Sequence, residues 1–129
     1  MPTIFSKIVA GEIPCHKVGE TEDFLAFLDI MPVAPGHTLV IPKQEVDYYF
    51  DLEDDVLTGL TLFAKTLAPK IEKVIPCARI GVSVVGLEVP HAHVHLIPIN
   101  HIGDMDFAKQ RSQADHAELA KLAEAIRNA

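Results

Sequence analysis

The sequence predicts an α+β protein with a five-stranded antiparallel sheet, one long helix and short helices near both ends. Three observations support this fold class. Five short apolar stretches are bounded by Gly, Pro and Asp, as strands usually are. One longer segment, residues 52–74, repeats apolar residues at the helical spacing of three or four. Helices fall before, within and after mostly adjacent strands, an order that favours an antiparallel sheet.

The shorter elements follow from local signals. The segment TIFSKIVAGEIP is predicted to be a helix, capped by Thr3 and stopped by Gly11 and Pro14. The last helix begins at Ser112 or Asp115. Its apolar stripe consists of Leu119, Leu122, Ala123 and Ile126. The expected strands are residues 15–18, 24–29, 37–42, 79–86 and 91–99.

The long helix has the clearest pattern, with Asp51 as its expected N-cap. Its apolar positions are Leu52, Val56, Leu60, Phe63, Leu67, Ile71 and Val74. Pro69 lies about 200° around the helix from Leu67, on the solvent side. We therefore expect a kink at this proline, and not the end of the helix.

Composition narrows the class of protein. A chain of 129 residues is most simply one domain, residues 1–129, and its 49% apolar content is enough for one core. The net charge of −7 argues against a nucleic-acid-binding surface. No apolar run suits a signal peptide or a membrane span, so we expect a cytoplasmic protein. Cys15 and Cys77 are expected as two reduced thiols or one disulfide.

Three histidines alternate with aliphatic residues in VPHAHVHLIPIN, residues 89–100. Successive side chains of a strand point to opposite faces, so His91, His93 and His95 share one face, about 6.6 Å apart. The aliphatic residues between them then face the core. Surface histidines without chemistry are one interpretation. A zinc site is another, although three alternate residues on one strand hardly converge on one ion. Catalysis by groups that titrate near neutral pH is the third.

The sequence resembles the histidine triad family of nucleotide hydrolases and transferases. HAHVHLIP is similar to that family's His-x-His-x-His pattern, and AFLDIMPVAPGHTLVIPK to a second signature with an Asp and a fourth His. TIFSKIVAGEIP and GLEVPH are similar to its N-terminal helix and to the turn before the triad. The resemblance covers residues 3–100 and is strongest with the small nucleoside phosphoramidases and their bacterial relatives. It implies a homodimer and a small-molecule purine nucleotide as substrate.

The resemblance also implies catalytic roles. His93 would be the nucleophile that attacks the α-phosphorus and forms a nucleotidyl-histidine. The carbonyl of His91 would fix the tautomer of His93, since the attacking nitrogen must be unprotonated. His95 would contact the phosphate and its leaving group. His37 would support the row, although it could also be a polar residue that opens a strand.

Nucleotide-binding residues are implied in the same way. Asp29 would accept hydrogen bonds from the ribose hydroxyls; a turn-forming aspartate is the alternative. Backbone amides at residues 86–89, which are Gly86, Leu87, Glu88 and Val89, would meet phosphate oxygens. The apolar walls around the base would be Phe5, Ile8, Phe27 and Ile30, or these four are plain core.

Departures from the family pattern concern the phosphate side. Leu87 stands where the family usually has a Gln, and Glu88 where the eukaryotic phosphoramidases have a Ser. The loop before them is shorter than in the family, and Ser83 aligns only weakly with an Asn that the family has there. Some bacterial relatives bind zinc through an N-terminal Cys-x-x-Cys. Thr3 and Ser6 stand there in this chain, so we expect no such metal and no cofactor.

The resulting hypothesis is a phosphoramidase-like hydrolase of purine nucleoside monophosphate derivatives that forms a covalent intermediate at His93. A diadenosine polyphosphate hydrolase or nucleotidyl transferase of the same family is one alternative. A nucleotide-binding protein with little turnover is another, because Leu87 cannot donate a hydrogen bond to phosphate.

Overall fold

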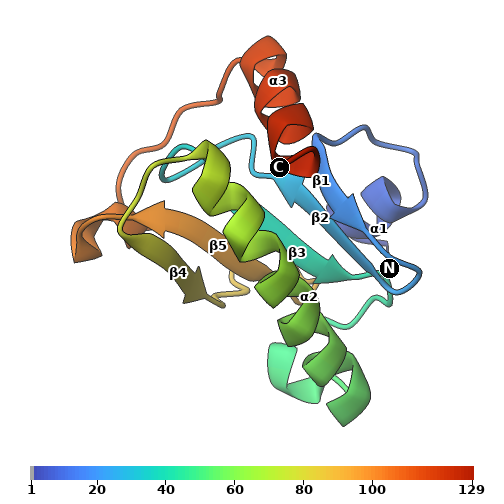
Figure 1. The fold of residues 1–129 in the computed structure, drawn as a ribbon. Coiled ribbons are helices and arrows are strands. Elements are labelled where there is room, and N and C mark those ends of the chain that lie inside the picture. The colour runs from blue at the N-terminus through green and yellow to red at the C-terminus, as the bar shows by residue number, and fades with distance from the viewer. Residues whose placement is uncertain (1) are drawn as a thin grey trace.

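Five strands form one antiparallel sheet in the computed structural model, which describes residues 2–129 (Figure 1). The strands are β1 (Lys17–Glu20), β2 (Phe24–Leu28), β3 (Thr38–Pro42), β4 (Arg79–Ser83) and β5 (Val94–Ile99). Their order across the sheet is β1-β2-β3-β5-β4, and all neighbours are antiparallel. The helices are α1 (Ile4–Val9), α2 (Asp54–Val74) and α3 (His116–Arg127), with short 3-10 helices η1 (Tyr49–Asp51) and η2 (Ile102–Met105). The predicted α+β class is confirmed.

Helix boundaries agree with the sequence except at the start of α2. Thr3 caps α1 and Asp115 caps α3, each accepting a backbone N–H with its side chain. The N-cap of α2 is Glu53, so the prediction of Asp51 was wrong. Asp51 belongs to the preceding 3-10 turn. The buried Leu52 that follows is extended, which delays the helix. Pro69 is exposed inside α2, and the helix continues past it.

The sheet separates two apolar clusters. Helices α2 and α3 lie on one face of the sheet, in front of it in Figure 1, and α1 lies behind it. The larger cluster, between these two helices and the sheet, contains residues from every layer, such as Leu60, Ile126 and Val40. The smaller cluster lies on the other face and consists of Phe5, Leu25, Phe27, Leu39 and Ile41. No helix within residues 2–129 is long and apolar enough to cross a membrane.

Side chains alternate between the two faces of the sheet along residues 91–96, and the three histidines lie on the face of the smaller cluster. Ala92, Val94 and Leu96 belong to the larger cluster, as predicted. The expectation of a surface row is wrong, because His91, His93 and His95 are only 0%, 5% and 6% exposed. Strand β5 also begins at Val94, so two of the three histidines precede it. Before β5, the backbone N–H groups of His91 and Ala92 donate to the carbonyls of Val89 and Val46 and form no ladder with a neighbouring strand.

Candidate functional site

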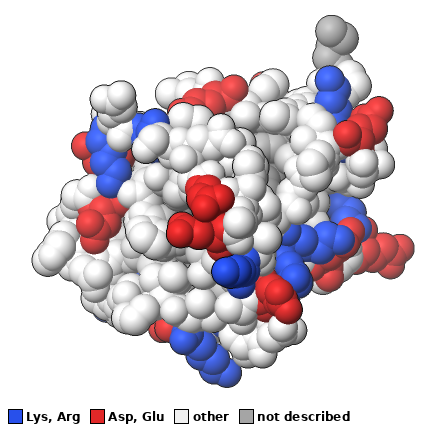
Figure 2. All heavy atoms as spheres, turned by 90° about the horizontal axis from the view of Figure 1, so that it is seen from above, with Lys and Arg blue, Asp and Glu red and all other residues white. Residues whose placement is uncertain are grey.

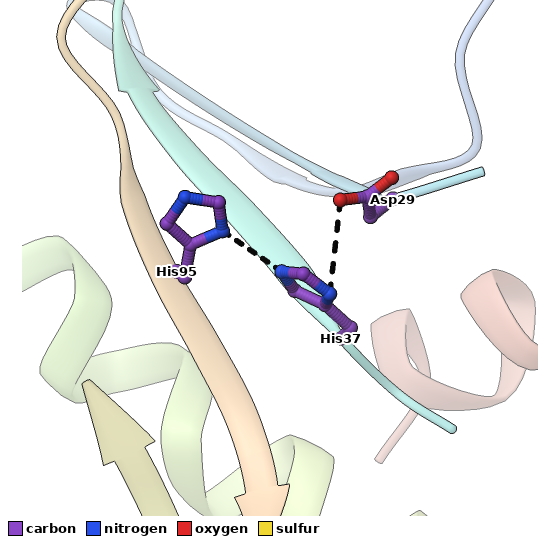
Figure 3. A group of neighbouring side chains, drawn as sticks. All are labelled: Asp29, His37 and His95. Carbon is purple, nitrogen blue, oxygen red and sulfur yellow. Dashed lines mark hydrogen bonds and ion pairs between the residues drawn. The ribbon is translucent and has the colours of Figure 1, made fainter. Parts of the chain in front are cut away.

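Antiparallel pairing of β3 with β5 brings the fourth histidine to the triad. Leu39 of β3 pairs with His95 of β5. His37 lies two residues before Leu39, so its side chain is on the same face of the sheet as that of His95. Nε2 of His37 lies 2.9 Å from Nδ1 of His95. Figure 3 shows these two rings with Asp29, and His37 lies between His95 and Asp29. Residues 58 positions apart therefore form one buried polar cluster.

His93 is held in the tautomer that a nucleophile needs. Its Nδ1 lies 2.6 Å from the carbonyl oxygen of His91, which can only accept, so Nδ1 carries the proton. Nε2 is therefore left with a lone pair. Burial lowers the pKa of His93, which favours the neutral ring. The Phe5 ring meets the His93 ring edge to face at 5.0 Å and fixes its plane.

His91 is anchored from both ring nitrogens and is fully buried. Its Nε2 donates to the carbonyl of Pro42 at 2.8 Å. Its Nδ1 therefore accepts from the hydroxyl of Thr3 at 3.1 Å. That hydroxyl in turn accepts the backbone N–H of Ser6 at 2.9 Å. The cap of α1 thus orients the residue whose carbonyl orients His93.

His37 and His95 form a directed chain of hydrogen bonds. The backbone N–H of Val33 donates to Nδ1 of His37 at 3.1 Å, so the proton of His37 is on Nε2. Nε2 then donates to Nδ1 of His95, which leaves the proton of His95 on its own Nε2. Burial is the main reason that the pKa values of both rings fall to about 3. Both rings are therefore neutral at physiological pH, and His95 is a hydrogen-bond donor.

Asp29 lies beside this chain at the end of β2. Its Oδ1 accepts the backbone N–H of Met31 at 2.8 Å. Its Oδ2 is 3.7 Å from Nδ1 of His37, a contact drawn as a dashed line in Figure 3. Because that nitrogen has no proton, the contact is not an ion pair. Burial raises the pKa of Asp29.

The same three side chains are the candidate metal ligands among the described residues. One ligand atom from each of Asp29, His37 and His95 lies within 4.8 Å of the others. Zinc bonds nitrogen at about 2.0–2.1 Å in a tetrahedron, which separates ligand nitrogens by about 3.3 Å. The nitrogens that face each other in His37 and His95 are 2.9 Å apart and share a proton. A metal would have to displace that hydrogen bond and the one from Val33.

The structure brings together three of the four residues predicted to enclose the base, and Ile30 is the exception. Phe5 and Phe27 are buried in the smaller cluster and meet edge to face at 5.5 Å. Ile8 packs against that cluster and is half-buried. Ile30 is 44% exposed, and its carbonyl accepts the N–H of Ala114. Phe5 and Phe27 therefore pack together in the smaller cluster beside the histidines, whereas Ile30 is on the surface.

The predicted phosphate loop lies beside His93 and His95. A pocket of 260 Å³ is lined by these two histidines together with Val85, Gly86, Leu87, Glu88, Phe107 and Ala108. Gly86 has φ of +77°, a conformation that glycine adopts without strain. Leu87 is 89% exposed. Ser83 pairs with His95 across the sheet, and Val89 accepts the N–H of His91 through its carbonyl. The loop and the histidines thus share one pocket.

Two residues of the site were missed from the sequence. The Phe107 ring is 4.8 Å from the His95 ring and 6.1 Å from the His37 ring. Arg111 donates to Glu88 at 2.7 Å and lies 3.9 Å from Asp29. Both come from the segment 106–115, which connects η2 to α3 (Figure 1). No local motif marks them, since only the folded path of this segment brings them to the histidines.

Comparisons with known proteins agree with the fold. The HIT domain model matches residues 10–102. The chain is 42% identical over 100 residues to an HIT-like protein of Mycoplasma pneumoniae, covering 74% of this chain and 69% of that protein. It is 39% identical over 102 residues to the adenosine 5'-monophosphoramidase hnt1 of Schizosaccharomyces pombe, covering 76% and 74%.

Structural similarity extends over nearly the whole chain. The crystal structure of a Hit-like protein from Bartonella henselae has a TM-score of 0.86 and 31% sequence identity. The match covers 98% of this chain and 94% of that one, so it includes the segment after the family model and α3. Together with the match of the family model to most of the chain, these findings show that the protein belongs to the histidine triad (HIT) family.

Proposed function

We propose that the protein hydrolyses purine nucleoside monophosphate derivatives at the α-phosphate, most readily those with a P–N bond. One observation carries the proposal. Two neutral rings with opposite functions, the lone pair of His93 and the N–H donor of His95, line the same 260 Å³ pocket. The first can attack phosphorus, and the second can donate a hydrogen bond to an oxygen of the same phosphate. The HIT relative named as an adenosine 5'-monophosphoramidase supports this substrate class.

The proposed reaction has two steps. In the first, Nε2 of His93 forms a bond to the α-phosphorus while the P–N bond breaks, and the amine leaves after taking a proton from solvent. His93 keeps its proton on Nδ1 and becomes cationic. The 2.6 Å contact to the His91 carbonyl is then a charge-assisted hydrogen bond. In the second step water attacks the phosphorus, releases the nucleotide and returns one proton to solvent.

Substrate binding is proposed to involve residues beyond the lining of this pocket as well as its phosphate loop. The carboxylate of Asp29 would accept the two ribose hydroxyls, and Phe5, Ile8, Phe27 and Ile30 would contact the base. Ser83 and the backbone of residues 86–89 would line the phosphate side. The raised pKa of Asp29 fits a carboxylate that is shielded from water and gains from hydroxyl donors.

The test compares the native protein with His93→Ala and His93→Gln variants on adenosine phosphoramidate without added metal. We expect AMP release by the native protein only. Quenching in an alkaline denaturant during turnover should trap up to one nucleotide per chain on the native protein and none on the variants, because a bond between phosphorus and a histidine nitrogen survives base. Turnover that survives in both variants would overturn His93 as the nucleophile. Turnover of diadenosine polyphosphates alone would move the protein to the dinucleotide hydrolases. AMP binding without any turnover would identify a nucleotide-binding protein.

We also propose that the protein forms a homodimer through β4. This strand is at the edge of the sheet, so one row of its backbone groups has no neighbouring strand. Apolar side chains are exposed on it and just after it: Val82 64%, Val84 38% and Val85 43%. Such a patch is typical of a protein interface. Light scattering should give about twice the chain mass of 14.1 kDa. Val82→Lys should give the single-chain mass, and a native monomer would contradict the proposal.

The face seen from above in Figure 1 is of mixed charge. Figure 2 shows the face that includes α3, where basic and acidic side chains alternate and no broad area of the described residues is basic. This distribution supports the expectation that nucleic acid is not a partner.

A further inference from the structure

Among the described residues, the lining of the pocket on the phosphate side contains no positively charged side chain. Both histidines that line it are neutral, and the charged side chain in its lining is Glu88. A phosphate placed against His93 would therefore face a carboxylate of the same sign. Leu87, the neighbouring side chain, cannot donate a hydrogen bond. A nucleotide needs a positive charge at this point, and residues 83–95 do not provide one.

Arg111 supplies a positive charge from outside the motifs found in the sequence. Its Nη2 donates to Oε1 of Glu88 at 2.7 Å, and its Nη1 donates to the carbonyl of Met31 at 3.3 Å. The same Nη1 is 3.9 Å from Oδ2 of Asp29. The Arg111 side chain is only 13% exposed, although it comes from an irregular segment. Arg111 thus lies between the carboxylate proposed for the ribose and the one beside the phosphate.

The segment that carries Arg111 is attached at several points. Phe107 covers His95 and His37 on the pocket side. The N–H of Ala114 donates to the carbonyl of Ile30 at 2.8 Å. The next residue, Asp115, caps α3, which packs on the sheet through the larger cluster. Arg111 is therefore positioned between two anchored points, as a binding residue must be.

We propose that Arg111 is a phosphate-binding and specificity-determining residue of the nucleotide site, an inference that rests on the proposed function. Arg111 neutralises Glu88 and donates to a phosphate oxygen. A guanidinium has five N–H donors in a planar fork, so it can hold Glu88 and the phosphate together. Arg111 thus provides the hydrogen-bond donor to phosphate that the Leu87 side chain lacks. The segment 106–115 is then part of the active site, and the site selects nucleotides over nucleosides.

The experiment measures AMP and adenosine affinity by calorimetry, together with kcat and KM for adenosine phosphoramidate. Arg111→Gln should weaken AMP binding and raise KM by roughly 10- to 100-fold, as expected for the loss of a hydrogen bond between charged groups. Adenosine affinity should stay within about threefold, since it has no phosphate to lose a contact. Arg111→Lys should recover part of the AMP affinity because it restores the charge without the fork. Lys109 is an exposed basic residue of the same segment. The matched control is therefore Lys109→Gln, which should change neither the AMP affinity nor the adenosine affinity.

A double variant separates the two roles of Arg111. In a Glu88→Gln background, Arg111→Gln should cost less AMP affinity than in the native protein, because the repulsion is gone, but the cost should remain measurable. A cost that vanishes would reduce Arg111 to neutralising Glu88 and overturn direct phosphate binding. Equal losses for AMP and adenosine would show that Arg111 only supports the fold. A lower KM in Arg111→Gln would show that the segment blocks the site.

The inference and the proposed function fail in different ways. A native protein that binds AMP better than adenosine through Arg111 but turns over no phosphoramidate would overturn the function alone. A native protein that turns over phosphoramidate with an unchanged KM in Arg111→Gln would overturn the role of Arg111 alone. Absence of both AMP and adenosine binding in the native protein would overturn both.

Discussion

Mild acid should destabilise the protein because folding keeps buried histidines neutral. Burial lowers the pKa of His37 and His95 from 6.5 to about 3. Between these values the unfolded chain binds more protons than the native protein. The free energy of unfolding contributed by these rings is therefore fully present above pH 6.5 and is lost as the pH falls toward 3. Their hydrogen bond explains part of the cost, since a proton on Nδ1 of His95 would meet the N–H of His37.

The magnitude follows from the two pKa values. For one ring, acidification from pH 7 to pH 5 should cost about 2 kcal/mol of unfolding free energy, and the two rings together about 4 kcal/mol. The lowered pKa of His93 acts in the same direction. Asp29 acts in the opposite direction, because its raised pKa favours the protonated native state as the pH falls. The expected net loss of about 2–4 kcal/mol is large against the 5–15 kcal/mol that stabilises most domains.

Urea unfolding at pH 7 and pH 5, at constant ionic strength, measures this loss. His37→Gln is the matched variant, because its amide can accept from Val33 and donate to His95 but cannot be protonated. Its loss between the two pH values should be smaller by about 2 kcal/mol. A native protein whose unfolding free energy changes by less than about 1 kcal/mol over this range would refute the reasoning. So would a His37→Gln variant with the native pH dependence.

Three further predictions concern other parts of the molecule. Thr3→Val removes the hydroxyl that donates to His91 and should lower the free energy of unfolding by about 1–3 kcal/mol in urea titrations; an unchanged midpoint would contradict that contact. Asp115→Ala removes the cap of α3 and should cost about 1 kcal/mol, whereas Asp115→Asn should cost less. Treatment with a chelator should leave phosphoramidase turnover unchanged. Turnover lost on chelation and restored by zinc would support a metal at Asp29, His37 and His95.

The parts of the fold that were predictable depend on short-range patterns. Helical periodicity located α2, and side-chain caps located the starts of α1 and α3. The start of α2 was missed because Leu52 is buried and belongs to the apolar pattern, yet its backbone is extended. A pattern of apolar residues reports which side chains are buried. It does not report whether the backbone beneath them has already become helical.

The site was predictable where its residues lie in compact motifs. His91, His93 and His95 are separated by single residues, so their shared face followed from strand geometry. That they are buried did not follow, because the second apolar cluster that covers them is assembled from other strands and α1. Arg111 and Phe107 depend on the path of an irregular segment across the molecule. Nothing in the neighbouring sequence encodes that path.

Alternation in the triad segment has a consequence for how this chain can change in length. Successive residues from His91 to Leu96 alternate between the face of the candidate site and the larger apolar cluster on the other side of the sheet. Deleting one residue within them would turn the imidazoles toward α2 and the aliphatic side chains toward the pocket. The loop at residues 84–90 does not alternate between the two faces of the sheet in this way, and Gly86 has open space around it. Insertions should therefore collect in that loop, where they reshape the pocket without exchanging its two sides.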